Sequence, residues 1–418
     1  DSYLLVQKFL KEPLSEKATI QKLQAQKVMP KKKPNIFLFV TESLREDFMT
    51  KEIAPNLHSF KQENIAISNS FSNANNSHHS WFCIFYSKLP FYWDKYKFSN
   101  WKSGSVPLQI LKQMGYKIHL YTSARLSYYE MDNRIFGQNQ YLADSVCFKP
   151  HEDGVKAFES DTLIVDQLRK DIQSLSEEGH VFITFLDSTH FNYSWPEETD
   201  SVFTPYVDSI DYIGTSCFKK DLEEVKNRYR NAIHYVDKLF GKVVETVKST
   251  KGWDDSVIIF TGDHGEEFME PRNLFHASEL NKPQTNVPIY LKLGMNKEKT
   301  AAKKGNIISH IDVFPSVLHH LLEQDYYSSL FDGQSILRKN RHSFVISSRY
   351  NASRAPFEFC LNNGNYKLLL RFKDEKQIFQ SPYLQVLSMK NAQDESLDWN
   401  LALIREQFGE SLQKIFSE

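Results

Sequence analysis

Short, continuous runs of apolar residues recur along the middle of the chain and predict buried strands. The first covers residues 36–40 and contains no polar side chain, which is typical of a strand covered on both faces of its sheet. Similar runs occupy residues 116–121, 181–186, 257–260 and 287–293.

Stretches with helical periodicity separate these runs. They cover residues 106–114, 162–175, 222–247 and 310–322. The longest carries an apolar stripe at three- and four-residue spacing, formed by Val225, Tyr229, Ile233, Val236, Phe240, Val243 and Val247. Alternation of strands and helices predicts an α/β fold with a mostly parallel central sheet and helices on both faces.

The two ends of the chain read differently from its middle. Residues 1–33 are mostly polar and end in a lysine run, so we interpret them as a lead-in linker that follows a removed membrane anchor. Residues 34–340 form the expected catalytic domain. In residues 341–418, strands at 344–347 and 366–372 precede an amphipathic helix at 397–416, which predicts a small C-terminal α+β subdomain packed on the main domain.

Charge and cysteine content narrow the functional classes. The chain has 51 basic and 52 acidic residues, without the basic excess of a nucleic-acid-binding protein. No run approaches the roughly 20 apolar residues of a membrane span. Cys83, Cys147, Cys217 and Cys360 are widely spaced, so we expect buried small side chains rather than a zinc ribbon or disulfides.

Acids and histidines follow three of the predicted strands. Glu42 comes after residues 36–40, His190 after 181–186, and the pair Asp263 and His264 after 257–260. Ligands of open α/β sheets bind at the carboxyl ends of the strands, so these side chains are expected to meet in one crevice. Two carboxylates and an imidazole are suitable ligands for Zn²⁺ or Mn²⁺. Taken singly, each of these residues could equally be an ordinary loop residue.

A hydroxyl nucleophile is expected in the polar loop 68–80, which leads into an apolar helix. Ser77 and Ser80 are the candidates, because a metal and helix N–H groups can activate a serine hydroxyl at a helix start. Serines in such loops are more often helix caps. The adjacent His78 and His79 are expected to be exposed residues of the helix start, with extra metal ligation as the alternative.

Four stretches of the chain, taken together, resemble the sulfatase-like branch of the alkaline phosphatase superfamily. They are residues 35–45, 229–237, 261–266 and 309–316, and the resemblance extends over roughly residues 34 to 325. Within the superfamily, the chain is most similar to phosphoethanolamine transferases, lipoteichoic acid synthases and inner-membrane sulfatase-like proteins of the cell envelope.

The resemblance implies a role for individual residues. Glu42, Asp263 and His264 match the metal ligands, and Ser77 matches the nucleophile, which also binds the metal. His190, in a Thr-His-Phe context, and His276, in Phe-His-Ala, match histidines that contact the phosphate or a second metal. Arg134 matches, more weakly, a substrate-binding arginine.

Two departures from the family pattern limit the activity. The residues after Cys83 and after Ser77 lack the proline and arginine that signal conversion to formylglycine, so sulfate-ester hydrolysis is not expected. Serine also stands where the family usually has threonine as nucleophile.

The resulting expectation is a metal-dependent phosphotransferase or phosphodiesterase that acts on an envelope lipid or glycan phosphoester. It would hold one or two Zn or Mn ions and use a phospholipid or lipid-linked glycan. It would be a monomer, bind no nucleic acid, and sit at the inner membrane through a preceding segment, with this domain periplasmic or extracellular. The alternatives are a phosphodiesterase or phosphatase with water as acceptor, and a non-catalytic lipid-binding or regulatory domain of the envelope.

Overall fold

A seven-stranded sheet lies at the centre of the computed structural model, which describes residues 3–5, 10, 12–150, 155–175, 179–210, 218–294, 307–376, 378–379 and 383–417. The strand order is β3 (Ile65–Ala66), β11 (Ile289–Leu293), β8 (Val257–Gly262), β2 (Ile36–Thr41), β7 (His180–Leu186), β5 (Lys117–Thr122) and β6 (Ser145–Phe148). The five strands from β8 to β6 are parallel, whereas β11 near one edge pairs antiparallel with both of its neighbours, β8 and β3. The predicted mostly parallel sheet is confirmed.

Successive residues of the sheet face two separate hydrophobic cores. Along β2, Ile36, Leu38 and Val40 belong to one core, while Phe37 and Phe39 belong to the other. This alternation follows from the two-residue period of a strand. Because both faces are covered, every residue of the strand is apolar or buried, which explains the continuous run in the sequence.

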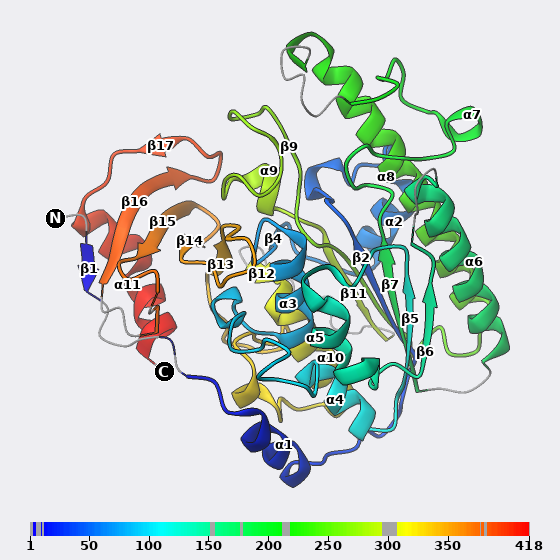
Figure 1. Cartoon of the computed structure of the whole chain (residues 1–418), viewed down its shortest axis with the longest axis horizontal. Helices are drawn as coiled ribbons and strands as arrows, with labels where there is room; N and C mark the ends of the chain where they lie inside the picture. Colours follow the sequence, from blue (N-terminus) through cyan, green and yellow to red (C-terminus); the bar gives the residue numbers. More distant parts are fainter. Residues whose placement is uncertain are drawn as a thin grey trace.

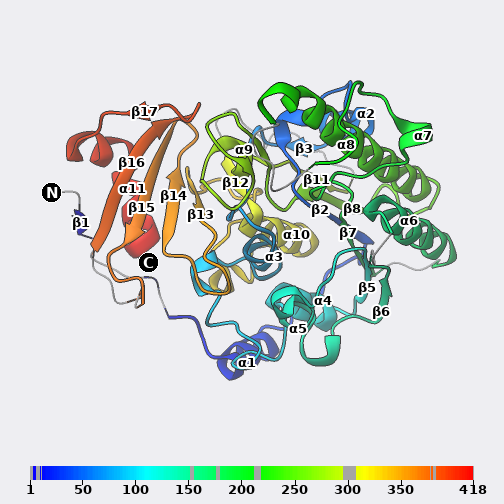
Figure 2. The ribbon, with the colours of Figure 1, turned by 45° about the horizontal axis from the view of Figure 1, so that its top comes forward.

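Helices cover both faces of the sheet, as Figure 1 and Figure 2 show. One core takes its side chains from α3 (Ser77–Tyr86), α4 (Val106–Gln113), α5 (Met131–Phe136) and α10 (Val313–Leu322). The other takes them from α2 (Pro55–Glu63), α6 (Ala157–Ser174) and α8 (Phe218–Lys248). All seven members of the apolar stripe predicted for the long helix are buried in this second core.

A second, antiparallel sheet forms the C-terminal subdomain on the left of Figure 1. Its order is β1 (Tyr3–Leu5), β16 (Tyr383–Asn391), β15 (Tyr366–Phe372), β14 (Glu358–Asn362) and β13 (Val345–Ser348), with β17 (Ser396–Leu397) also paired to β16. Helix α11 (Leu401–Ser417) completes the subdomain.

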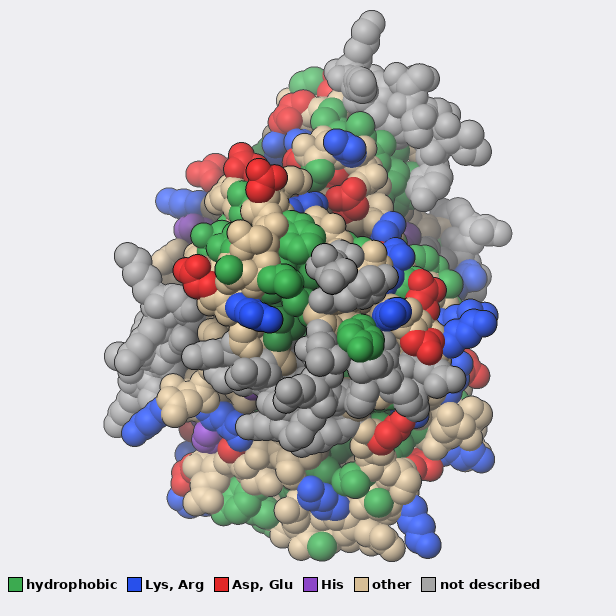
Figure 3. Space-filling view, turned by 90° about the vertical axis from the view of Figure 1, so that its left-hand side faces the viewer, with side chains coloured by type: hydrophobic (Ala, Val, Ile, Leu, Met, Phe, Trp, Pro, Cys, Tyr) green, Lys and Arg blue, Asp and Glu red, His purple; other side chains and the backbone are tan. Residues whose placement is uncertain are grey.

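The face in Figure 3 carries charges of both signs, interspersed with apolar side chains.

The segment expected to be a linker contributes to the fold. Strand β1 pairs with β16, and α1 (Glu16–Ala25) buries Leu23 in the core shared with α3 and α4. Residues 1–33 are polar overall, so their few apolar side chains give a weak local signal. Their pairing with residues that follow much later in the chain cannot be seen from local pattern.

Shorter elements connect the layers. They are β4 (Asn69–Phe71) paired with β12 (Ile307–Ser309), β9 (Glu267–Phe268) paired with β10 (Leu274–Phe275), the helical turns α7 (Glu197–Asp200) and α9 (Lys282–Thr285), and the 3-10 turns Glu46–Phe48, Pro90–Tyr92, Tyr128–Glu130, Gln138–Gln140, His310–Asp312 and Ser328–Leu330. None of the helices in the described parts of the chain combines the length and apolar character needed to cross a bilayer.

The cysteines follow the expectation where they are described. Cys83 and Cys360 are buried free thiols, and Cys147 is a half-buried one. Cys217 lies outside the described residues.

The packing of α8 on the sheet gives a stability prediction. The Phe240 ring makes edge contacts with Phe39, Phe60 and Phe260. Phe240→Ala should therefore lower the free energy of unfolding by about 3–5 kcal/mol, measured by urea denaturation. The control is Leu163→Ala on α6, since Leu163 is 56% exposed and should change stability by less than about 0.5 kcal/mol. Equal unfolding midpoints for both variants would contradict this packing.

Candidate metal and nucleophile site

The register of the central sheet brings three loops to one edge. Thr41 at the end of β2 pairs with Leu186 on β7 and with Gly262 on β8. The next residues continue the ladder, because Glu42 N donates to Leu186 O and Asp263 N donates to Thr41 O, each at 3.0 Å. Glu42 and Asp263 therefore leave the sheet side by side, as the strand pattern predicts.

Close backbone approaches explain the two glycines that flank the Asp263–His264 pair. A Cβ on Gly262 would lie 2.6 Å from Leu44 O, and one on Gly265 would lie 2.0 Å from Pro283 O. Only glycine fits both places without moving the chain.

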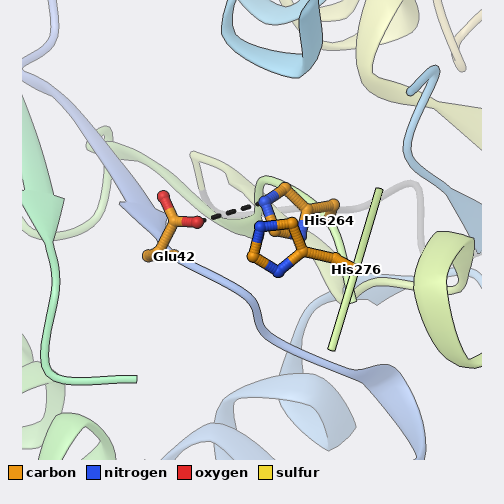
Figure 4. A group of neighbouring side chains, drawn as sticks. All are labelled: Glu42, His264 and His276. Atoms are coloured by element: carbon orange, nitrogen blue, oxygen red, sulfur yellow. Dashed lines mark ion pairs between the residues drawn. The ribbon is translucent and has the colours of Figure 1, made fainter. Parts of the chain in front are cut away.

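Glu42, His264 and His276 form a potential metal cluster, drawn in Figure 4. Each offers one ligand atom, and these atoms lie within 4.8 Å of one another. Glu42 Oε1 is 3.1 Å from His264 Nε2, and the two imidazole rings are 4.2 Å apart. His276, which the resemblance assigns to the phosphate or a second metal, thus shares one cluster with the expected ligands.

The hydrogen bonds of the two histidines leave Nε2 on each ring available as a ligand. His264 Nδ1 lies 2.9 Å from Gly265 O, and His276 Nδ1 lies 3.0 Å from Glu266 Oε1. Both partners can only accept, so Nδ1 carries the proton in each ring. A carboxylate behind a ligating histidine is the usual arrangement at metal sites.

Ser77 lies at the first turn of α3 with its hydroxyl in the same cluster. Its Oγ is 3.0 Å from Glu42 Oε1 and 3.2 Å from His264 Nε2. Asn76 begins the helix, because its side chain accepts from His79 N. The other candidate, Ser80, is buried and donates to Ala74 O at 3.1 Å. The geometry thus favours Ser77 over Ser80.

Asp263 is fixed on both oxygens. Its Oδ1 accepts from Ser43 N at 2.9 Å and His264 N at 2.7 Å, and its Oδ2 accepts from Trp81 Nε1 at 3.2 Å. Oδ2 also lies 3.7 Å from His264 Nε2. Trp81 belongs to the apolar start of α3, and sequence reasoning gave it no role because indoles in such a position usually pack in the core.

The charges at this site fit a divalent cation. Burial and the neighbouring Glu42 carboxylate raise the pKa of Asp263. Burial alone would raise the pKa of Glu42, but the hydrogen bond and charge of His264 lower it. With the proton on Nδ1, His264 Nε2 and the Glu42 Oε1 atom 3.1 Å away are both acceptors, and a cation between them would satisfy both. Two carboxylates, imidazole and a hydroxyl suit Zn²⁺ or Mn²⁺.

Glu266 and Tyr193 form a second layer that sequence reasoning missed. Glu266 is fully buried, and its Oε2 accepts from Tyr193 Oη at 3.1 Å while Oε1 holds His276. The sequence did contain a signal for Glu266, because this acid follows the Asp263–His264 pair after a single glycine. The backbone around His276 is left-handed at Phe275 (φ 69°) and Ala277 (φ 65°), conformations that cluster at functional sites.

His190 lies at the rim of the cluster. Its ring is 6.5 Å from that of His276, and its side chain is exposed. Desolvation by neighbouring atoms opposes protonation, but the carboxylates of Asp187, Glu42 and Glu266 outweigh it and raise the pKa of His190 to about 9. The neighbouring Thr189 fixes this loop, because its hydroxyl donates to Glu42 O.

Arg134 is not brought together with these residues. Its guanidinium carbon lies 3.8 Å from the centre of the Trp93 ring, and its nitrogens donate to the carbonyls of Tyr129, Trp93 and Tyr96. None of the metal-cluster residues is among these partners.

The expectation that His78 and His79 are exposed is wrong. Both are buried, with His78 Nε2 2.9 Å from Ala352 O and His79 Nε2 3.1 Å from Arg354 O. Neither belongs to the metal cluster found among the described residues. They tie the start of α3 to the loop between β13 and β14, a contact across more than 270 positions that local sequence does not reveal.

Three comparisons with known proteins agree with this architecture. Residues 34–323 match the sequence model of the Sulfatase family. The Kdo(2)-lipid A phosphoethanolamine 7''-transferase of Escherichia coli (strain K12) is 23% identical over 171 residues, 40% of this chain and 27% of the transferase. Inner membrane protein YejM of Salmonella typhi is 21% identical over 359 residues, 84% of this chain and 53% of YejM.

A solved structure shows the same fold over nearly the whole length. The lipoteichoic acid synthase LtaP from Listeria monocytogenes superimposes with a TM-score of 0.62 at 16% identity, covering 96% of each chain. Against the two curated relatives, the aligned part spans about half of YejM and about a quarter of the transferase.

Removal of the indole that holds Asp263 should weaken metal binding. Trp81→Phe keeps most of the packing but loses the bond to Asp263 Oδ2, so affinity for Zn²⁺ should fall roughly 10–100-fold. Competition with a chromophoric chelator measures this change. Trp101→Phe is the matched control, because Trp101 is equally buried and donates to Gly104 O instead. Equal losses in the two variants would argue against a specific role for Trp81.

Burial of His78 should appear in the pH dependence of stability. Desolvation lowers the pKa of His78 to about 3 in the folded state, from 6.5. The unfolded chain binds the proton first, so this contribution to stability is complete above pH 6.5 and is lost as pH falls toward 3. His78→Asn should reduce the slope of unfolding free energy against pH between about 6.5 and 4. An unchanged slope would mean that His78 titrates normally.

Proposed function

Since the chain belongs to the Sulfatase family, we propose that it catalyses metal-dependent transfer of a phospho group through Ser77. The observation that carries this proposal is the position of Ser77 Oγ, 3.0 Å from Glu42 Oε1 and 3.2 Å from His264 Nε2 at the start of a helix. A hydroxyl in such a place can be both a metal ligand and a nucleophile. The missing formylglycine signature favours phosphoesters over sulfate esters.

The residues that would hold the metal are Glu42, Asp263, His264 and Ser77, with His276 beside them. When bound, the ion would lower the pKa of the serine hydroxyl and polarise the phosphate. Zn²⁺ and Mn²⁺ are both consistent with these donors. A second ion would require His276 and His190 as ligands.

The chain's own groups would carry the transfer steps. The Ser77 hydroxyl proton is directed at Glu42 Oε1, which leaves an Oγ lone pair for attack on phosphorus. The new Oγ–P bond would form as the bond from phosphorus to the donor alcohol breaks, and the alcohol would leave with the proton that Ser77 gave up. Protonated His190 would stabilise the charge on the non-bridging oxygens, with the His276 ring beside it.

The second step would return the enzyme to its starting state. An acceptor hydroxyl bonds to phosphorus as the Ser77 Oγ–P bond breaks, and its proton passes to the serine. Water as acceptor gives a phosphodiesterase or phosphatase, whereas a lipid or sugar hydroxyl gives a transferase.

The names of the relatives support an envelope substrate. One is a Kdo(2)-lipid A phosphoethanolamine transferase, one is an inner membrane protein, and LtaP is a lipoteichoic acid synthase. We extend these classes to this chain as a phospholipid or lipid-linked glycan substrate, met at the inner membrane by a domain on its outer side. Arg134 would act on this substrate only indirectly, by holding the segments that carry Trp93 and Tyr129.

Ser77→Ala should keep the fold and reduce turnover by several orders of magnitude. The assay is hydrolysis of bis(p-nitrophenyl) phosphate with added Zn²⁺ or Mn²⁺, together with intact-mass detection, in the wild type, of a phosphoserine diester at Ser77 that retains one nitrophenyl group. Ser80→Ala is the matched control, because its hydroxyl faces Ala74 O, and it should retain turnover within a few-fold.

Metal content decides between the catalytic and non-catalytic alternatives. Elemental analysis should find about one ion per chain in the wild type and none in Glu42→Ala. A wild type that stays metal-free after incubation with Zn²⁺ and Mn²⁺, and forms no phosphoserine, would favour the non-catalytic envelope domain.

A further inference from the structure

A group of aromatic side chains surrounds His78, the residue that follows the nucleophile. The His78 ring lies 4.0 Å from Tyr129, 5.1 Å from Trp93, 5.8 Å from Tyr350 and 6.0 Å from Tyr128, measured between ring centres. We call these four aromatic residues the aromatic platform. Neither the metal site nor the transfer steps described above use them.

The platform is tied to the nucleophile loop from two directions. Tyr350 N donates to Asn75 Oδ1 at 2.9 Å, two residues before Ser77. His78 Nε2 meets Ala352 O at 2.9 Å, one residue after Ser77. The same Asn75 accepts from Ala277 N, next to His276. The platform and the metal cluster are therefore held by one loop and lie at neighbouring positions along it.

Two rings of the platform face solvent, unlike ordinary core aromatics. Tyr128 is 56% exposed and Tyr350 is 37% exposed. The hydroxyls of Tyr129 and Tyr350 lie 3.3 Å apart, so one donates to the other and both are near the surface. Apolar ring area left in water beside an active site is a feature of ligand contact surfaces.

The backbone that presents the rings is strained. Tyr129 (φ 50°), Glu130 (φ 58°) and Ala352 (φ 47°) adopt left-handed conformations, although none is glycine. Such residues persist where the surroundings impose the conformation, most often at functional sites. The segment 128–130 leads directly into α5, which packs beside α3 (Figure 2).

We propose that the aromatic platform binds a pyranose ring of the acceptor, so that the transferase alternative with a sugar hydroxyl as acceptor applies. This proposal rests on the proposed function, because it assigns the acceptor for the same Ser77 site. Stacking on Tyr128 and Tyr350 covers the apolar face of the sugar, while the tyrosine hydroxyls bond its hydroxyl groups. One sugar hydroxyl oxygen then bonds to phosphorus as the Ser77 Oγ–P bond breaks, and the hydroxyl proton passes to Oγ.

A sugar fits this surface better than a cationic head group. Trp93 is itself fully buried, and the positive charge of the Arg134 guanidinium, 3.8 Å from its ring centre, disfavours a second cation there. The remaining exposed rings carry hydroxyls that can both donate and accept. Such groups match the alternating hydroxyls of a sugar ring, which a quaternary ammonium lacks.

Binding can be tested without any turnover. Saturation-transfer NMR with maltotriose and chitotriose should show binding to the wild-type chain, and the double variant Tyr128→Ala/Tyr350→Ala should bind about tenfold more weakly or worse. Tyr350→Phe keeps the ring and should retain most of the affinity. The matched control is Tyr326→Ala, because Tyr326 is 43% exposed and lies outside the platform. Circular dichroism checks that each variant is folded.

Several outcomes would overturn the proposal. They are equal sugar affinity in the wild type and the double variant, no binding of either oligosaccharide by the wild type, or saturable binding of choline chloride in their place. In the transfer assay with bis(p-nitrophenyl) phosphate, the fraction of product that appears on added sugar rather than water should fall in the double variant. An unchanged fraction would also count against the platform.

The two proposals fail in different ways. Absence of metal and phosphoserine, with platform-dependent sugar binding intact, would refute the catalytic function alone. Formation of phosphoserine, together with a sugar affinity that does not change when Tyr128 and Tyr350 are replaced, would refute the platform proposal alone.

Discussion

The pairing of β2 between β7 and β8 is the constraint on which the site depends. Parallel strands in register end at the same height, and here the ladder continues one residue further through Glu42 N and Asp263 N. Two buried carboxylates are thereby forced to leave the sheet together. The hydrogen bonds from Ser43 N, His264 N and Trp81 Nε1 then fix Asp263, so the ligand positions follow from backbone geometry rather than from flexible side chains.

This arrangement is electrostatically unfavourable for the protein by itself. Desolvation and the neighbouring Glu42 carboxylate raise the pKa of Asp263, whereas the hydrogen bond and charge of His264 lower the pKa of Glu42. A divalent cation bound here would stabilise both carboxylates at once, so its binding would also stabilise the fold. The residues behind the cluster, Glu266 and Tyr193, are also held by hydrogen bonds. Glu266 holds His276 while Tyr193 holds Glu266, and a loose side chain in this layer would let the ligands spread apart.

Sequence pattern predicted the parts of the structure that depend on local signals. The continuous apolar runs located β2, β7 and β8, the stripe on α8 located its buried face, and the strand ends located Glu42, Asp263 and His264. Contacts between segments that are distant in the chain leave no local pattern in the sequence from which they could be predicted. The pairing of β1 with β16, the burial of His78 and His79 against residues 352 and 354, and the bond from Trp81 to Asp263 each join side chains whose sequence neighbours look ordinary. Such features require the tertiary structure, because burial of a polar residue is decided by its partner and not by its neighbours in sequence.

Two kinds of group surround Ser77, and they are held by different parts of the fold. The ligand atoms come from the edge of the central sheet, whose register tolerates little change. The aromatic platform comes from segment 128–130 and from the loop after β13, which belong to different layers of the molecule and meet only at the start of α3. A loop can vary in length and sequence without disturbing the ladder between β2 and β8. The chemistry that we propose at Ser77 would therefore stay fixed while the proposed platform selects the acceptor. The left-handed backbone at Tyr129 and Ala352 lies outside the central sheet, which does not require it.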